Sequence, residues 1–237
     1  MKLKAKSNKR VLHQHVQPLF LALLCQLGIA HPLSAQELKA DAQAGKAKAA
    51  ACIACHQLPY SADEKVPRLA GQSADYLLDA MQAYKRGDRQ HALMQALAQP
   101  LSKQDMADIS SYFSQIKPVE AKLQPRQLST DAIAKRALGE RLVNMNNCVS
   151  CHGQGMAKPS DNNIPSLSGM SPVYLESALR SYIPPPGQEQ GSRRNAMMRY
   201  ALNITDPKTG KERFFNEQEL RAMAEYISSV QHEKSAR

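Results

Sequence analysis

The motif Cys-x-x-Cys-His occurs twice in this chain of 237 residues, at positions 52–56 and again at 148–152. In each copy two thiols and one imidazole lie within five consecutive residues, so the local backbone has to hold three reactive side chains together. The two copies begin 96 residues apart. The fold of this chain must therefore provide two separate sites of the same chemistry.

Covalent attachment of haem accounts for all three residues of the motif. The two thiols add to the two vinyl groups of one porphyrin, which sets their spacing, and the imidazole of the next residue lies under the iron. The alternatives are a disulfide, a redox-active dithiol and half of a zinc site. No βαβ pattern of the thioredoxin type surrounds either copy, and the 96-residue separation does not suit one tetrahedral zinc site. The two motifs therefore predict two covalently bound haem c groups.

An internal repeat surrounds the two motifs. Arg89 and Met94 recur 104 positions later as Arg193 and Met198, and Tyr112 recurs as Tyr226 after 114 positions. Closer to the motif, seven residues recur 98 positions later, as the same or a similar residue: Val66, Pro67, Leu69, Gly71, Ser73, Tyr76 and Leu77. The growing offset means that the second copy carries insertions. Proline and glycine in the segments 184–187 and 206–210 mark two of these insertions as loops.

Each repeat is predicted to be helical, with no competing strand pattern. Helices are expected at 40–51, 74–85 and after Ser102 in the first repeat, and at 131–146, 172–182 and after Asn216 in the second. Ser102 and Asn216 are each followed three residues later by an acidic residue, which is typical of a helix N-terminus, and an apolar face follows at helical spacing. The fold class is therefore all-α, with domains at 36–117 and 130–237 and a linker at 118–129.

Residues 1–35 are predicted to be a secretory signal peptide. They hold five basic and no acidic residues, an apolar run from Pro18 to Ala30, and small residues at 34 and 35. We expect cleavage after Ala35 and a periplasmic mature protein. The apolar run is shorter than the roughly 17–25 residues that span a bilayer. An uncleaved anchor and lipidation at Cys25 are the alternatives.

The sixth iron ligand is expected to be a methionine. Only Met94 and Met198 are aligned in the repeat and lie shortly before the last helix, outside a regular apolar stripe. Met197 is the immediate alternative in the second repeat, and His91 is the rival ligand in the first. Thioether sulfur raises the reduction potential relative to a second imidazole, and it leaves the iron no vacant position.

The net charge of +10, from 31 basic and 21 acidic residues, is unevenly distributed. Half of it lies in residues 1–35, and residues 36–120 are neutral. Arg193, Arg194 and Arg199 surround Met198, so a basic rim is expected there that would steer an acidic redox partner or an anionic membrane surface. A merely solvated surface is the alternative. Nucleic acid is excluded as a partner, because the chain is exported and has no aromatic stacking platform.

Taken together, these features resemble the class I cytochrome c family. Each half has the haem motif, a downstream Pro-x-Leu-x-Gly, a methionine and a closing helix with a tyrosine, and two such halves after a signal peptide are similar to the two-haem cytochrome c4 type. The resemblance covers nearly all of residues 36–237. It implies one covalent haem on Cys52 and Cys55 with axial ligands His56 and Met94, and another on Cys148 and Cys151 with axial ligands His152 and Met198. The insertions on either side of Met198 depart from the family pattern.

This resemblance implies a periplasmic electron carrier rather than an enzyme, one that passes single electrons between respiratory redox proteins such as a membrane oxidase or reductase. Transient association with the membrane surface is compatible with it. A cytochrome subunit of a larger dehydrogenase or oxidase complex is the first alternative, and a two-haem peroxidase-like enzyme is the second. Pro67 and Pro165 are expected to lie beside the histidine rings and to accept the second ring N–H through a backbone carbonyl. A role as simple turn residues is the alternative.

Overall fold

The computed structural model describes residues 38–57, 64–118 and 129–234, and residues 38–237 group into one compact unit. The predicted signal peptide and most of the predicted linker lie outside the described residues. Helices dominate the described part of the chain, and only one short pair of strands accompanies them. The all-α fold class is confirmed.

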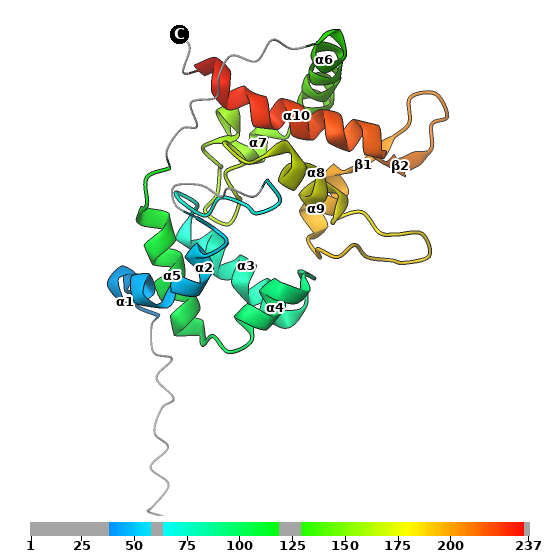
Figure 1. Cartoon of the computed structure of the whole chain (residues 1–237). Coiled ribbons are helices and arrows are strands. Elements are labelled where there is room, and N and C mark those ends of the chain that lie inside the picture. Colours follow the sequence, from blue (N-terminus) through cyan, green and yellow to red (C-terminus); the bar gives the residue numbers. More distant parts are fainter. Residues whose placement is uncertain (1–37, 58–63, 119–128, 235–237) are drawn as a thin grey trace, which may run out of the picture. The chain divides into compact units, whose positions relative to one another are not determined.

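The first repeat folds into a series of short and medium helices (Figure 1). They are α1 (Ala42–Lys48), α2 (Ala50–Ile53), α3 (Ala74–Arg86), α4 (Ala92–Ala98) and α5 (Lys103–Gln115). Ser102 and Asp105 form the expected reciprocal cap at the start of α5. Gly87, at φ +83°, ends α3 in the left-handed conformation that glycine adopts readily. The helix predicted over 40–51 is in fact two helices divided at Ala49, and α4 was not predicted.

The second repeat has the corresponding helices and, in addition, a 3₁₀ turn and a β-hairpin. Its helices are α6 (Thr130–Met145), α7 (Val149–His152), the 3₁₀ turn η1 (Gln154–Met156), α8 (Pro172–Arg180), α9 (Ala196–Ala201) and α10 (Glu217–Lys234). At the start of α10 the carboxylate of Glu219 accepts from the N–H of Asn216, and the side chain of Asn216 accepts from the N–H of Glu219. The predicted cap is therefore present.

The insertion at 203–214 forms a β-hairpin, where the sequence indicated only a loop. Strands β1 (Asn203–Thr205) and β2 (Glu212–Phe214) pair antiparallel. The carboxylate of Asp206 stabilises the turn by accepting from the N–H groups of Lys208 and Thr209 at 2.9 and 3.0 Å. Arg213 on β2 binds both Asp206 and Glu219. The hairpin is thereby attached to the first turn of α10.

Each repeat has its own hydrophobic core. The first is built around Leu77, Ile109 and Phe113, and the residues that pack against it include Cys52, Tyr76, Met81 and Tyr112. The second is larger and includes Leu142, Val143, Met156, Met170, Leu175, Leu202, Phe215, Leu220, Met223 and Ile227. Two separate cores agree with two domains of similar design.

A glycine permits a close helix crossing in each repeat. Helix α1 packs on α5, and α6 packs on α10. A Cβ added to Gly45 would lie 2.0 Å from the carbonyl oxygen of Asp108, and one added to Gly139 would lie 2.0 Å from that of Ala222. Only a residue without a side chain allows the two backbones of each pair to approach this closely. In both repeats the first and last helices cross immediately before the haem motif, so the crossing helps to position it.

Polar contacts join the two repeats. Arg68 donates to the carbonyl oxygen of Ser168 at 2.6 Å, and the amide of Gln72 exchanges two hydrogen bonds with the backbone of Ser166. Arg68 and Gln72 are buried. Among the described residues, no helix combines the length and the hydropathy needed to cross a bilayer.

Candidate functional site

The first Cys-x-x-Cys-His motif lies at the end of α2. The backbone N–H of His56 donates to the carbonyl oxygen of Cys52 at 2.8 Å, which continues the helical turn through the motif. Cys52 is half-buried and Cys55 is exposed, whereas the side chain of His56 is buried. The ring atom Nδ1 of His56 lies 2.9 Å from the carbonyl oxygen of Pro67.

The second motif repeats this geometry on α7. The backbone N–H of His152 donates to the carbonyl oxygen of Cys148 at 3.0 Å, and Nδ1 of His152 lies 2.9 Å from the carbonyl oxygen of Pro165. His152 is buried, while Cys148 and Cys151 are half-buried. Both proline carbonyls therefore lie where the sequence placed them, beside the histidine ring.

The proline carbonyls fix the chemistry of the two imidazoles. A carbonyl oxygen only accepts, so Nδ1 carries the proton in both rings and Nε2 keeps its lone pair. Burial lowers the pKa of His56 and His152, and the hydrogen bonds to Pro67 and Pro165 only partly oppose this effect. Each ring is therefore a neutral imidazole with one nitrogen prepared to bind a metal, held in place by its other nitrogen.

The half-buried thiols of Cys52 and Cys148 are poor nucleophiles. Burial raises the pKa of Cys52, and it raises the pKa of Cys148 to about 11. A redox-active dithiol needs the opposite, a thiol whose pKa is lowered by a positive environment or a helix N-terminus. The environment of these cysteines therefore lacks the features of a redox-active dithiol.

The two candidate methionines lie at the same position of two short helices. The sequence placed them shortly before the last helix of each repeat and outside a regular apolar stripe, and in the structure Met94 lies on α4 and Met198 on α9. The N–H of Met94 donates to Nδ1 of His91 at 3.3 Å, and the N–H of Met198 donates to the side-chain oxygen of Asn195 at 2.9 Å. These N-caps begin each helix three residues before its methionine.

The surroundings of the methionines differ between the repeats. Met198 is half-buried against the second core, as is Cys148, whereas the neighbouring Met197 is 73% exposed. Met94 is also half-buried, but in the first repeat it is Met81 that packs against the core beside Cys52. The structure therefore brings Cys148 and Met198 to the second core, whereas Met94 is not among the described residues that pack against the first core. His91, the rival ligand, is exposed and acts as a cap.

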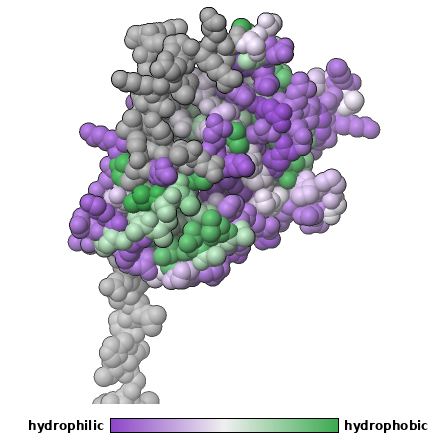
Figure 2. Space-filling model, in the orientation of Figure 1, coloured by the Kyte–Doolittle hydropathy of each residue, from purple (hydrophilic) through white to green (hydrophobic). Residues whose placement is uncertain are grey.

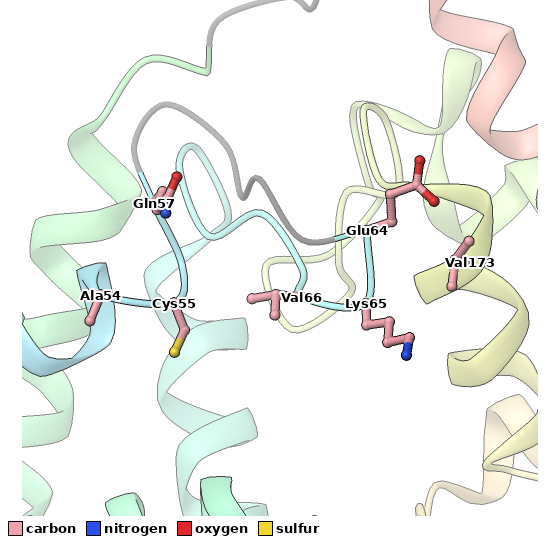
Figure 3. Close-up of a pocket in the computed structure, with 7 residues that line it drawn as sticks. All are labelled: Ala54, Cys55, Gln57, Glu64, Lys65, Val66 and Val173. Atoms are coloured by element: carbon pink, nitrogen blue, oxygen red, sulfur yellow. The ribbon is translucent and has the colours of Figure 1, made fainter.

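A cleft of about 770 Å³ opens beside the first motif (Figure 3). Its lining is Ala54, Cys55, Gln57, Glu64, Lys65, Val66 and Val173. In Figure 3 the side chain of Val66 projects toward Cys55. The volume lies within the roughly 300–1,000 Å³ typical of pockets for small ligands and cofactors. Cys55 is the residue of the haem motif that lines this cleft, whereas Cys52 and His56 are not among its lining residues.

Some functional residues were missed by the sequence reasoning. His91 and Asn195 are aligned in the repeat at the same offset as Met94 and Met198, and both can act as N-caps, so the repeat itself carried the signal for α4 and α9. Arg68, on the segment after the haem motif, is buried, and its Nε atom has no hydrogen-bond partner among the described residues. No pattern in the sequence indicated that it would contact the other repeat.

Comparison with known proteins places both repeats in one family. The family model "Cytochrome c" matches residues 42–117 and 136–231. A thiosulfate dehydrogenase electron acceptor from Thiomonas intermedia is 33% identical over 68% of this chain and 75% of its own length. Cytochrome c4 from Pseudomonas aeruginosa is 33% identical over 69% of this chain and 80% of its own. The solved structure of reduced cytochrome c4 from Pseudomonas stutzeri covers 80% of this chain and 98% of its own, with a TM-score of 0.61 and 27% identity.

Proposed function

This chain belongs to the cytochrome c family as a protein of the two-haem cytochrome c4 type, and we propose that it passes single electrons between redox proteins of the periplasm. Cytochrome c domains hold haem c covalently, and the protein is an electron-transfer protein. The finer points of the proposal are the number of haem groups, their ligands, the compartment and the partners.

One observation carries the proposal: the same site is built twice. In each repeat a Cys-x-x-Cys-His motif is followed by a proline carbonyl 2.9 Å from the histidine Nδ1, and then by a methionine three residues after the N-cap of a short helix. Taken alone in one domain, the motif, the proline carbonyl and the methionine could each have a purely structural role. Their recurrence in the same order, on two cores of the same design, supports two equivalent cofactor sites.

We assign a role to each residue of these sites. Cys52 and Cys55 would hold one haem c, and Cys148 and Cys151 the other. His56 and His152 would bind the iron through Nε2, and Met94 and Met198 would be the further ligands. The haem iron supplies the redox chemistry, because it takes up and releases one electron.

The protein residues keep the sites rigid. Pro67 and Pro165 hold the imidazole planes through their carbonyls, and His91 and Asn195 begin the helices that carry the methionines. Little rearrangement is then needed when the iron changes oxidation state. If a histidine and a methionine both bind each iron, no position would be left for a substrate, and this would favour a carrier over a peroxidase-like enzyme.

Different surfaces lie beside the two methionines. On α4, Leu93 and Leu97 are exposed, and Figure 2 shows a hydrophobic patch in this region of the molecule. On α9 the exposed side chains are Met197, Arg199 and Tyr200, and Tyr200 is 82% exposed. We infer that the two domains meet different redox partners, and that the basic surface of the second domain faces an acidic one.

The relative from Thiomonas intermedia suggests one such partner. It is named a thiosulfate dehydrogenase electron acceptor, so we propose that a dehydrogenase donates electrons to this protein and that a membrane oxidase or reductase accepts them. A permanent cytochrome subunit of a dehydrogenase complex is the second candidate, favoured by the same name. Co-purification with a larger redox protein would separate a subunit from a free carrier. The leader supports export to the periplasm.

A spectroscopic redox titration tests the ligand assignment. The wild type is compared with Met94→Ala, Met198→Ala and the control Met197→Ala, which removes an exposed methionine from the same helix. We expect Met94→Ala and Met198→Ala each to lose one high-potential wave, because sulfur is the ligand that raises the potential. Met197→Ala should keep both waves. Two unchanged waves in Met94→Ala and Met198→Ala would show that other residues bind the iron.

A further inference from the structure

The β-hairpin at 203–214 is an addition to the second repeat, and the junction at its base is the same as in the first repeat. Between α4 and α5, the N–H of Leu101 donates to the carbonyl oxygen of Ala98 at 3.2 Å. Between α9 and α10, the N–H of Phe215 donates to the carbonyl oxygen of Leu202, also at 3.2 Å. Two residues separate the bonded pair in the first repeat, whereas the whole hairpin separates it in the second. The connection between the two helices therefore does not require the hairpin.

The hairpin is anchored at its base and carries positive charge at its turn. Arg213 binds one carboxylate of the hairpin at 2.9 Å and one of α10 at 2.8 Å. Two side chains of the strands pack against the second core, Ile204 and Phe214. Lys208 and Lys211, in the turn, are exposed, and neither forms an ion pair within the part of the chain that the structure describes. They outnumber Glu212, the exposed acidic residue of the hairpin. The turn therefore presents positive charge from a fixed base.

Helix α9, which the hairpin follows directly, exposes large side chains that α4 does not have. Tyr200 and Met197 are mostly exposed, and Arg199 is exposed as well. At the repeat positions of Arg199 and Tyr200, α4 has Gln95 and Ala96. Tyrosine, methionine and arginine are enriched in protein–protein interfaces, and tyrosine and arginine dominate the residues that contribute most to binding. The exposed side of α9 is therefore suited to a protein partner.

The structure fixes both ends of α9. In the segment before it, Arg193 pairs with Arg89 of the first domain in an isolated antiparallel β-bridge. After it, β1 begins at Asn203 and contacts the helix. Figure 1 shows the hairpin projecting from the second domain next to this helix. The exposed side chains thus stand on a backbone that is already ordered, so that a partner would bind them with little loss of backbone entropy.

We propose that α9 and the turn of the hairpin form one docking surface for a redox protein with an acidic face, and that the first domain lacks this surface. Lys208 and Lys211 steer the partner, because attraction between opposite charges speeds encounter. Tyr200 and Met197 hold the docked partner through apolar contact. The inference rests on the proposed function and deepens it, since Met198, the proposed iron ligand, lies on the same helix.

The steering role is tested with an acidic blue-copper protein as the probe, because its copper accepts one electron from a reduced haem protein. The measurement is the second-order rate constant of electron transfer, by stopped flow at several ionic strengths. The double variant Lys208→Gln/Lys211→Gln should be slower by about three- to tenfold at low ionic strength, and its rate should fall less with added salt. Replacement of 203–214 by Gln-Pro, the connection of the first repeat, should give the same loss. The control Lys39→Gln/Lys46→Gln removes the same charge from exposed positions of the first domain and should stay close to the wild-type rate.

The anchoring role is tested by the affinity for the same probe. Tyr200→Ala should raise the dissociation constant by about tenfold, mainly through faster dissociation, and should keep the salt dependence of the wild type. Leu93→Ala is the matched control, because Leu93 is exposed on α4 at the repeat position of Met197. This control should leave the affinity unchanged. The reduction potentials of all variants are measured as well, so that a changed driving force is not mistaken for changed docking.

Equal rates in Lys208→Gln/Lys211→Gln and its control would overturn the docking surface, and so would an unchanged affinity in Tyr200→Ala. The proposed function is tested separately with hexacyanoferrate(III), a small one-electron oxidant that needs no protein docking surface. A reduced wild type that this reagent does not oxidise contradicts electron transfer itself. A wild type that it does oxidise, with hairpin variants that behave like their controls toward the copper protein, contradicts the docking surface alone.

Discussion

The close crossing of α6 and α10 at Gly139 gives a prediction whose sign depends on the structure. On helix propensity alone, Gly139→Ala should stabilise the second domain by about 1 kcal/mol. In the structure the new Cβ would lie 2.0 Å from the carbonyl oxygen of Ala222 and 2.9 Å from the Cβ of Tyr226. Real Cβ contacts essentially never fall below 3.0 Å, so the backbone of α10 would have to recede by about 1 Å.

The obstacle is helical backbone rather than a flexible side chain. We therefore take the upper end of the overpacking range, about 3 kcal/mol. After subtraction of the gain in propensity, Gly139→Ala should destabilise the domain by about 2 kcal/mol. For a domain of this size that corresponds to a melting temperature lower by roughly 10 °C.

Thermal unfolding followed by far-ultraviolet circular dichroism measures this effect. Ala137→Gly is a control in the same helix, at an exposed position, and should cost only the propensity difference of about 1 kcal/mol. Haem content is determined for each variant, so that loss of cofactor is not mistaken for loss of packing. A Gly139→Ala protein as stable as the wild type, or more stable, would refute the close crossing.

Two further predictions concern side chains that organise the first domain. The buried carboxylate of Asp108 accepts from Lys48 at 2.7 Å and from the N–H of Asp41 at 2.9 Å. Burial alone would raise the pKa of Asp108, but these donors outweigh burial, so that the pKa lies below its ordinary value. The contribution of Asp108 to the stability of the fold is therefore present above pH about 4 and is lost as the pH falls below that value. The Asp108→Asn variant should be less stable than the wild type at pH 7 by about 1–3 kcal/mol. In urea titrations its stability should also depend less on acid pH than that of the wild type. His91→Ala should destabilise α4 by about 1 kcal/mol and lower the reduction potential of the first domain. His91→Asn introduces the cap residue of the second domain and should keep the potential of the wild type. Equal potentials in the two variants would contradict a capping role.

The sequence was sufficient for the repeated elements of the fold. The haem motif has a fixed spacing, the caps at Ser102 and Asn216 are local, and the proline after each motif occupies the same register in both repeats. These signals act over a few residues, so they can be read without tertiary structure. The expected hydrogen-bond geometry of Pro67 and Pro165 followed from that register, and the structure has it at 2.9 Å in both domains.

What the sequence did not indicate depends on distant contacts. The need for glycine at position 139 arises from Ala222 on another helix, and the bridge between Arg89 and Arg193 joins segments 104 residues apart. The strands at 203–214 are three residues each, too short for an alternating pattern, and they are attached to α10 through Arg213. Helices α4 and α9 were missed for another reason, because 7 and 6 residues are too few to show a helical apolar period.

Electron transfer by this protein, as proposed, requires two haem groups bonded to one chain. Intact mass spectrometry of the mature protein purified from its native host tests this directly. The proposal predicts a chain that begins after residue 35 and carries the added mass of two haem groups, with peptides 52–56 and 148–152 each modified at both cysteines. Unmodified thiols in either peptide, or the mass of a single haem, would contradict it.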